Sequence, residues 1–207
     1  MGGILILNGS PRAARSNSKR YAAMLEERCG CETAYFPISK TNHQALCGKL
    51  GEVSDVVLVF PLYADGIPVT LLNFLKALER HPPKHRPTVS VLINCGFLEC
   101  RQNDVAVEMV RLFCRQNGYR FGSVLKIGSG EAIWDTPFRL LVARKIRRFA
   151  ASLMRGAYGT WQVTMPLSPR LFLRASTAYW TKYGERNGVT RAQMETMEIE
   201  GQAGGGR

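Results

Sequence analysis

The sequence predicts an α/β fold: a doubly wound, five-stranded parallel sheet followed by a C-terminal helical extension. Two observations lead to this prediction. Short apolar runs of strand length alternate with helix-type patterns through residues 4–127. Beyond residue 135 only helix-type patterns follow. Alternating strands and helices favour parallel pairing with right-handed crossovers, which places helices on both faces of one sheet.

Residues 4–50 are expected to contain the first two strand–helix pairs. The run ILIL at residues 4–7 is bounded by Gly and Asn, which is typical of a short buried strand. Residues 18–28 carry apolar side chains at helical spacing and predict a helix. Residues 32–37 and 41–50 repeat the strand and the helix with weaker patterns.

The strongest patterns follow. DVVLVF at residues 55–60 is short, continuous and rich in Val, as expected for a strand buried on both faces. Residues 69–80 predict an amphipathic helix, and Pro68 precedes it, where a missing N–H is harmless. TVSVLIN at residues 88–94 predicts a fourth strand.

A last strand–helix pair completes the predicted sheet. Residues 104–117 predict a helix, and Gly118 follows as a C-terminal stop. Residues 121–127 predict the fifth strand. Five such strands are sufficient for a doubly wound sheet.

The C-terminal third predicts helices. Residues 136–155 place apolar side chains on one stripe, and residues 168–182 predict a second helix ended by Gly184. Thr190 and Gln193 form a capping-box pattern for a short final helix.

These elements suggest one domain with an extension. We expect a core of residues 1–135 and a helical extension, residues 136–200, packed on the same domain. Residues 201–207, GQAGGGR, are expected to be a disordered tail.

The composition excludes several classes of protein. The chain has 207 residues, enough for one hydrophobic core, and no apolar run approaches the ~20 residues that span a bilayer. No basic residue precedes the first apolar run, so a cytoplasmic protein is expected. The six cysteines include no Cys-x-x-Cys pair, so we expect free thiols and no metal site. The net charge of +12 favours anionic partners without selecting one.

Ligands of doubly wound sheets bind at the carboxyl ends of the strands, which directs attention to three loops. The first, NGSPRAARSNS at residues 8–18, leads into a helix whose N-terminus offers free N–H groups and a favourable dipole for a phosphate. The absence of GxxxxGK[ST] and GxGxxG disfavours a nucleotide triphosphatase and an ordinary dinucleotide site. A Ser-rich, N-capped turn is the alternative. Arg15 adds charge, and the candidate phosphate ligands are Ser10, Arg12, Ser16, Asn17 and Ser18.

The second and third loops suit an aromatic ligand. In PLYADGIP, Tyr63 can lie against a ring and Gly66 permits a close approach of the backbone, although a simple turn with a core tyrosine is the alternative. In NCGFLECRQND, backbone amides can hydrogen-bond the edge of a ring. Phe97 either forms a wall of the ligand site or belongs to the hydrophobic core. Buried, inert thiols are favoured over redox-active ones for Cys95 and Cys100. The candidate ligands here are Pro61, Leu62, Tyr63, Ala64, Asp65, Gly66, Asn94, Cys95, Gly96 and Phe97.

These three loops, in this order, resemble the NADPH-dependent FMN reductase family of flavodoxin-like proteins over roughly residues 3–130. The family's GSPR…SN[ST] phosphate loop corresponds to GSPR at residues 9–12 and SNS at residues 16–18. Its P-x-Y-x-x-x-x-P segment, which borders the flavin ring, corresponds to residues 61–68. Its third flavin loop corresponds to residues 94–99.

The resemblance implies a flavodoxin-like, FMN-binding core with sheet order 2-1-3-4-5, and usually a homodimer in which the partner completes the flavin site. It implies electron transfer from NAD(P)H through FMN to a small acceptor, such as a quinone, a flavin, an azo or nitro compound, or a metal ion. No acid–base triad is apparent, so we predict binding residues and no catalytic side chain. A flavodoxin-type FMN electron carrier without small-molecule turnover is the alternative. Such carriers are typically acidic, so the charge of +12 favours the reductase.

The segment RLLVARKIRRFAASLMR, residues 139–155, is basic and contains no acid. Such a helix is compatible with a membrane surface, but a core-packed helix with a solvated basic face is the favoured interpretation. Nucleic-acid binding is not expected, since no aromatic–basic interleaving or DNA-binding motif is present.

Overall fold

A six-stranded parallel sheet forms the centre of the computed structural model, which describes residues 2–196. The strand order is β2-β1-β3-β4-β5-β6. All five neighbouring pairs are parallel. The strands are β1 Ile4–Asn8, β2 Thr33–Pro37, β3 Asp55–Pro61, β4 Thr88–Asn94, β5 Phe121–Ile127 and β6 Thr160–Val163.

The sixth strand corrects the predicted five-stranded sheet. β6 (TWQV) pairs with β5 from Val124↔Thr160 to Ile127↔Val163, in the predicted helical extension but between the helices expected over residues 136–155 and 168–182. Only four residues form it, and Thr160 and Gln162 are exposed, as is usual for a short edge strand. An isolated run this short has no clear hydrophobic pattern, since its conformation depends on the neighbouring strand. The expected order 2-1-3-4-5 is present and is extended by β6.

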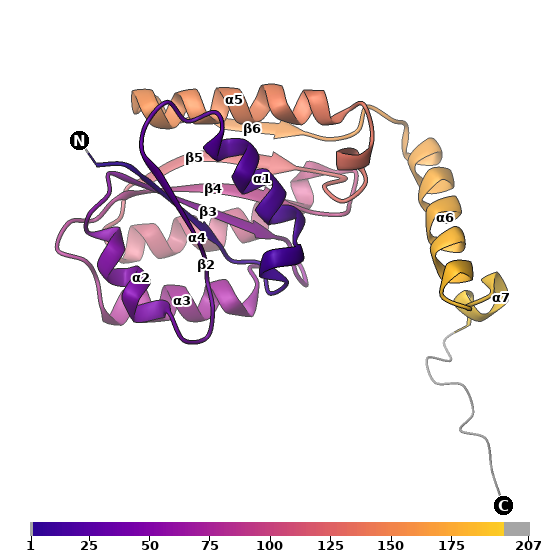
Figure 1. Ribbon diagram of the computed structural model, residues 1–207, viewed down its shortest axis with the longest axis horizontal. Coiled ribbons are helices and arrows are strands. Elements are labelled where there is room, and N and C mark those ends of the chain that lie inside the picture. Colours follow the sequence, from indigo (N-terminus) through magenta and orange to yellow (C-terminus); the bar gives the residue numbers. More distant parts are fainter. Residues whose placement is uncertain (1, 197–207) are drawn as a thin grey trace, which may run out of the picture. The chain divides into compact units, whose positions relative to one another are not determined.

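Helices cover both faces of the sheet (Figure 1). α1 and α5 lie on one face, and α2, α3 and α4 lie on the other. Their bounds are α1 Asn17–Glu26, α2 His43–Leu50, α3 Val69–Arg80, α4 Asp104–Gln116 and α5 Arg139–Arg155. This arrangement confirms the doubly wound α/β prediction.

The core follows the alternation of the strands. Leu5 and Leu7 in β1 and Phe60 in β3 join the apolar cluster with α3 side chains such as Phe74. The alternate residues, such as Ile6, are also fully buried and face the other helix layer. Both faces of the central strands are therefore covered, which explains their continuous apolar sequences.

α5 belongs to the same compact unit as the sheet. Val142, Ile146 and Phe149 are fully buried at helical spacing. Ser152 shares a hydrogen bond of 2.7 Å with Ser123 of β5. The helix ends at Gly156, whose φ of 63° is left-handed and favours glycine.

The described part of the chain divides after Met165 into two compact units. Within its described part, the second unit contains α6 (Pro169–Arg186) and α7 (Arg191–Met194). The capping box of Thr190 and Gln193 is present at the start of α7. The packing of this second unit on the sheet stays a prediction, and the tail expected at residues 201–207 lies outside the described residues. None of the described helices combines the length and apolar character needed to cross a membrane.

Candidate functional site

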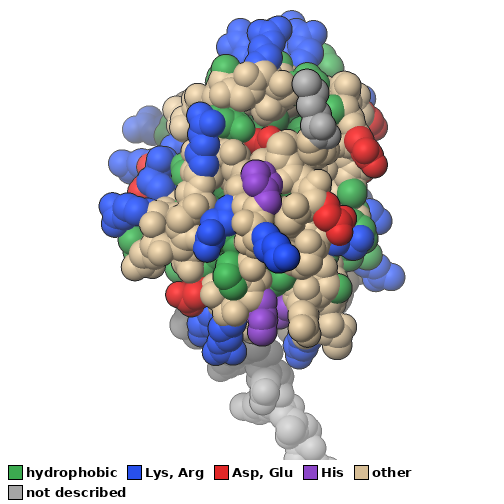
Figure 2. All heavy atoms as spheres, turned by 90° about the vertical axis from the view of Figure 1, so that its left-hand side faces the viewer, with side chains coloured by type: hydrophobic (Ala, Val, Ile, Leu, Met, Phe, Trp, Pro, Cys, Tyr) green, Lys and Arg blue, Asp and Glu red, His purple; other side chains and the backbone are tan. Residues whose placement is uncertain are grey.

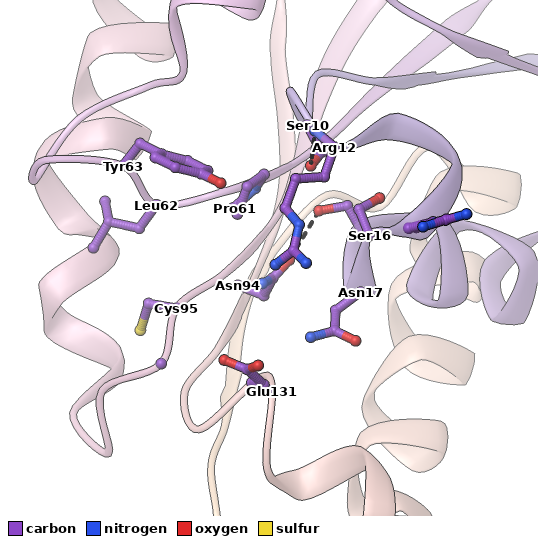
Figure 3. A pocket seen from close by; sticks show the side chains of 13 residues that line it. Ser10, Arg12, Ser16, Asn17, Pro61, Leu62, Tyr63, Asn94, Cys95 and Glu131 are labelled. Atoms are coloured by element: carbon purple, nitrogen blue, oxygen red, sulfur yellow. Dashed lines mark hydrogen bonds between the residues drawn. The ribbon is translucent and has the colours of Figure 1, made fainter. Parts of the chain in front are cut away.

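A cavity of about 180 Å³ opens at the carboxyl edge of the sheet (Figure 3). Four segments far apart in sequence meet there: the loops after β1, β3, β4 and β5. Its lining residues are Ser10, Arg12, Arg15, Ser16, Asn17, Ser18, Pro61, Leu62, Tyr63, Asn94, Cys95, Gly96 and Glu131. The structure thus brings the three predicted loops together around one cavity.

The loop after β1 folds around the side chain of Asn8, the last residue of that strand. Asn8 is fully buried. Its Nδ2 donates to Ser16 Oγ at 3.2 Å and to Tyr35 Oη at 2.9 Å. Its Oδ1 accepts the backbone N–H of Ser10 at 2.9 Å. One amide side chain therefore holds both ends of the loop.

Ser16 ends the loop and caps α1. Its hydroxyl accepts the backbone N–H of Lys19 at 3.1 Å and donates to the carbonyl of Ala13 at 2.7 Å. These bonds occupy the hydroxyl predicted as a phosphate ligand, so Ser16 contributes chiefly by shaping the loop. The first N–H groups of α1 have no acceptor within the helix and, with the helix dipole, favour an anion.

Two distant contacts fix α1 at the edge of the cavity. Ser18 Oγ donates to Asn94 Oδ1 at 3.1 Å, and Tyr21 Oη donates to the carbonyl of Gly130 at 2.6 Å. Tyr21 is fully buried, and burial raises the pKa of its hydroxyl well above its usual value of 10.0. The hydroxyl therefore stays protonated and keeps donating.

The loop after β3 is a tight turn with unusual backbone angles. The backbone of Leu62 donates to the carbonyl of Asn94 at 2.8 Å. Tyr63 and Gly66 exchange two backbone hydrogen bonds of 3.1 and 2.9 Å. The two residues between them, Ala64 and Asp65, have φ of 45° and 58°. Left-handed φ at both central residues matches a type I′ turn, which normally contains Asn or Gly. Strain of this kind is common at functional loops.

The loops after β4 and β5 pack closely. The backbone of Gly130 donates to the carbonyl of Cys95 at 2.7 Å. A Cβ at Gly130 would lie 2.9 Å from Asn94 Cβ, so only glycine permits this approach. Glu131 follows directly and lines the cavity (Figure 3).

Four predicted site residues do not line the cavity: Ala64, Asp65, Gly66 and Phe97. The first two form the turn itself. Phe97 is half exposed beside the site. Glu131 was not predicted as a site residue. It belongs to GSGE at residues 128–131, which follows the predicted fifth strand, and a loop at that position reaches the same edge of the sheet. Arg15 was noted for its charge but not named as a ligand.

The charges around the cavity are mixed. The exposed Arg12 and Arg15 supply positive charge beside the N-terminus of α1. Glu131 supplies the single carboxylate among the lining residues. Within residues 2–196, no group of three His, Cys, Asp or Glu side chains is placed to hold a metal ion. The arrangement therefore suits a ligand that places an anionic group near Arg12 and Arg15. It also suits ligand hydroxyl groups that can hydrogen-bond to Glu131.

Cys95 turns its thiol into the protein. Its sulfur accepts a hydrogen bond from Asn103 Nδ2 at 3.3 Å. Burial is the largest effect on this group and raises the pKa of the thiol above its usual 9.0. The described cysteines are free, and Cys31 is exposed.

We expect iodoacetamide to label Cys31 well before Cys95 and Cys114 at about pH 8, because only the accessible thiolate reacts. Burial raises the pKa of Cys114 from 9.0 to about 12. Burial also raises the pKa of Cys31, so its labelling rate should still increase above pH 9.0. Mass spectrometry of peptides from timed samples measures each site. Rapid labelling of Cys95 in the folded protein would contradict its buried placement.

Known proteins resemble this chain in structure. No family model and no curated protein matches its sequence. The NAD(P)H:quinone oxidoreductase of Methanothermobacter marburgensis has a TM-score of 0.57 and 13% identity, covering 74% of this chain and 96% of that one. A flavodoxin of Streptococcus pneumonia has a TM-score of 0.55 and 14% identity, covering 74% and 99%. An FMN-dependent NADH-azoreductase of Bacillus anthracis has a TM-score of 0.53 and 14% identity, covering 74% and 99%.

The chain has a flavodoxin-like fold. The resemblance that its three loops suggest is thereby confirmed at the level of the fold. Quinone reductases, azoreductases and flavodoxins are among the solved structures that share this architecture.

Proposed function

We propose that this flavodoxin-like protein is an FMN-dependent NAD(P)H oxidoreductase that passes electrons to a small acceptor. One observation carries the proposal: the phosphate-type loop at residues 8–18 shares a single cavity with the loops that contain Tyr63 and Asn94. A phosphate site alone would suit many ligands. A phosphate site beside an aromatic residue and a backbone-lined loop suits a phosphorylated, flat ring system.

The donor set fits FMN. Arg12, Arg15, Ser10 and the N-terminus of α1 offer positive charge and N–H and O–H donors for the phosphate. The cavity of about 180 Å³ is smaller than the roughly 300–1,000 Å³ of pockets that enclose a whole ligand of this size. In our proposal the phosphate end is enclosed and the flavin ring lies over the open rim beside Tyr63, which is 44% exposed.

Each part of the site then has one task. Bound FMN would supply hydride and electron transfer. Arg12 and Arg15 balance the charge of its phosphate. Tyr63 offers a ring face for stacking, and Asn94, held by Ser18, fixes the loop at the ring edge. In our proposal these residues bind and orient the cofactor, and the absence of a side-chain nucleophile stays a prediction.

The co-substrate is NADH or NADPH, and the acceptor is a quinone, a flavin, an azo or nitro compound, or a metal ion. The names of the similar solved structures support NADH or NADPH as the co-substrate, since they include NAD(P)H quinone reductases and azoreductases. The open rim leaves space for a second protomer, so we include a homodimer in the proposal. The cytoplasmic location expected from the sequence stays part of the proposal.

Purified protein mixed with FMN should become yellow and retain the flavin through gel filtration. Under anaerobic conditions, NADH or NADPH should then bleach the visible absorbance, and adding a benzoquinone should restore it. Free FMN at the same concentration is the control. Absence of flavin binding would overturn the proposal. Binding of FMN without bleaching by either nucleotide would instead favour the electron-carrier alternative.

A further inference from the structure

The cavity at the carboxyl edge of the sheet carries charges of opposite sign that are not paired with each other. Arg12 and Arg15 line it, and Glu131 supplies the single carboxylate among the lining residues. Figure 3 shows Arg12 and Glu131 entering the cavity from opposite sides. In the part of the chain that the structure describes, none of the three side chains takes part in an ion pair. A bound ligand therefore has to complement a positive end and a negative end.

Positive charge alone does not distinguish this cavity. The chain has a net charge of +12, and Figure 2 shows Lys and Arg side chains spread over the side of the molecule that faces left in Figure 1. Two arginines at a cavity follow this general trend. A carboxylate at the same cavity goes against it, so Glu131 is the more distinctive of the charged groups.

The backbone around Glu131 is held on both sides. Before it, Ser129 has a left-handed φ of 51°, which is uncommon for a residue other than glycine. The backbone N–H of Ser129 donates to the carbonyl of Phe97 at 2.6 Å, and its hydroxyl shares a hydrogen bond of 3.1 Å with Thr164. After it, Ile133 is fully buried, and its N–H donates to the carbonyl of Ser129 at 2.8 Å. The loop therefore presents Glu131 from a defined position.

Tyr21 joins this loop to α1, the helix whose first turn borders the cavity. Its hydroxyl donates to the carbonyl of Gly130 at 2.6 Å, directly before Glu131. The ring of Trp134 packs edge-on against Tyr21, with ring centroids 5.4 Å apart. The guanidinium of Arg20 lies 5.6 Å from the centre of the Trp134 ring. α1 and the loop after β5 thus form one frame, so the separation of the two ends of the cavity is set before a ligand binds.

A carboxylate restricts what a ligand can place beside it. It accepts hydrogen bonds and donates none, and it repels a second anion. The ligand group at Glu131 must therefore be a hydrogen-bond donor. In FMN, a chain of hydroxyl-bearing carbons joins the phosphate to the ring. The imide N–H of the ring is a second donor, but in our proposal the ring lies over the rim beside Tyr63, outside the enclosed volume of about 180 Å³. The hydroxyl-bearing chain is the donor left for Glu131.

We propose that Glu131 recognises the hydroxyl-bearing chain of the flavin, and that Tyr21 positions Glu131 for this contact. The inference rests on the proposed function and assigns the part of the ligand between its phosphate and its ring. It makes the enclosed end of the cavity selective for a phosphorylated sugar alcohol. A ligand with a phosphate alone meets the arginines but leaves the carboxylate without a donor.

A comparison of riboflavin with lumiflavin tests this assignment. The two share the same ring and carry no phosphate, but lumiflavin has a methyl group in place of the chain. Fluorescence titration of the apoprotein should show tighter binding of riboflavin. Glu131→Ala should lower this preference about tenfold by weakening riboflavin alone, because a hydrogen bond to a charged group is lost. Tyr21→Phe leaves the carbonyl of Gly130 without its donor, so it should lower the preference about threefold and leave lumiflavin binding unchanged.

Two controls accompany these variants. Glu99→Ala removes an exposed carboxylate of the neighbouring loop that does not line the cavity, and we expect it to keep the preference of the parent protein. Glu131→Gln keeps an acceptor oxygen without the charge, so its preference should lie between those of the parent and Glu131→Ala. Circular dichroism checks that each variant is folded.

A second measurement does not require a flavin. Thermal unfolding is followed with orthophosphate or with ribitol 5-phosphate at the same concentration. The parent protein should be stabilised more by ribitol 5-phosphate, whereas Glu131→Ala should be stabilised equally by both. If no flavin binds but this difference is found, the proposed function fails and the assignment of Glu131 stands.

Four results would overturn the inference. An unchanged preference for riboflavin in Glu131→Ala would show that the chain lies elsewhere. Equal weakening of riboflavin and lumiflavin would place Glu131 at the ring. An equal loss in Glu99→Ala would indicate a general effect of charge. Equal stabilisation of the parent protein by orthophosphate and ribitol 5-phosphate would show that the cavity does not recognise the chain.

Discussion

Replacing both Arg12 and Arg15 by glutamine is expected to weaken FMN binding about 100-fold and to leave riboflavin binding nearly unchanged. The two guanidinium groups border the cavity beside the N-terminus of α1, where a phosphate would lie. Charge-assisted hydrogen bonds contribute about 1.5–3 kcal/mol each, and exposure to solvent reduces this value. A total near 3 kcal/mol corresponds to about two powers of ten in Kd. Riboflavin has no phosphate, so it lacks the group that these arginines are proposed to contact.

Fluorescence titration of the apoprotein with each flavin measures the effect. Lys19→Gln is the matched control, since it removes a nearby positive charge that does not border the cavity. We expect its FMN affinity to stay within about threefold of the parent, as for a screened surface charge. Equal losses for FMN and riboflavin in the double variant would contradict the phosphate assignment.

Phe149→Ala should lower the free energy of unfolding by about 3–5 kcal/mol, the usual cost of removing a buried phenylalanine. Phe149 lies in α5 and is fully buried in the unit that contains the sheet. Its loss leaves a cavity between this helix and the sheet. Urea denaturation monitored by circular dichroism gives the change, and the unfolding should remain a single transition because α5 and the sheet share one core.

The neighbouring Arg148→Ala provides the control. Arg148 is exposed, so we expect its effect to stay within about 0.5 kcal/mol. A loss below about 1 kcal/mol for Phe149→Ala, or a separate early transition, would show that α5 is loosely attached. That result would contradict the expectation from the sequence that residues 136–200 pack on the same domain as residues 1–135.

The parts of the fold that follow from local sequence were predictable. The buried strands β1, β3 and β4 are continuous apolar runs, and their positions agree with the predicted ranges. β6 was missed because its four residues pair only through β5, and alternate positions face solvent. A strand of this kind is defined by its neighbour more than by its own composition.

The candidate site was predictable to the extent that it follows from topology. In a parallel sheet the carboxyl ends of all strands share one edge, so the loops at Ser10, Tyr63 and Asn94 had to be close. Which side chains turn inward depends on loop geometry. The left-handed turn at Ala64 keeps that residue off the cavity, and the close approach at Gly130 brings Glu131 to it. The left-handed turn at Ala64 and Asp65 has no characteristic residue in the sequence. The close approach of the loops is indicated only by Gly130.

The hydrogen bonds that hold α1 have a consequence for the order of events during synthesis. Ser18 bonds to a residue 76 positions later, and Tyr21 to one 109 positions later. Helix α1 therefore leaves the ribosome early, but its two contacts across the fold cannot both form until translation has passed Gly130. Such long-range closure delays folding relative to local contacts. Capture of the proposed phosphorylated ligand would thus be a late step of biogenesis, and we expect the nascent N-terminal third to be unable to bind it alone.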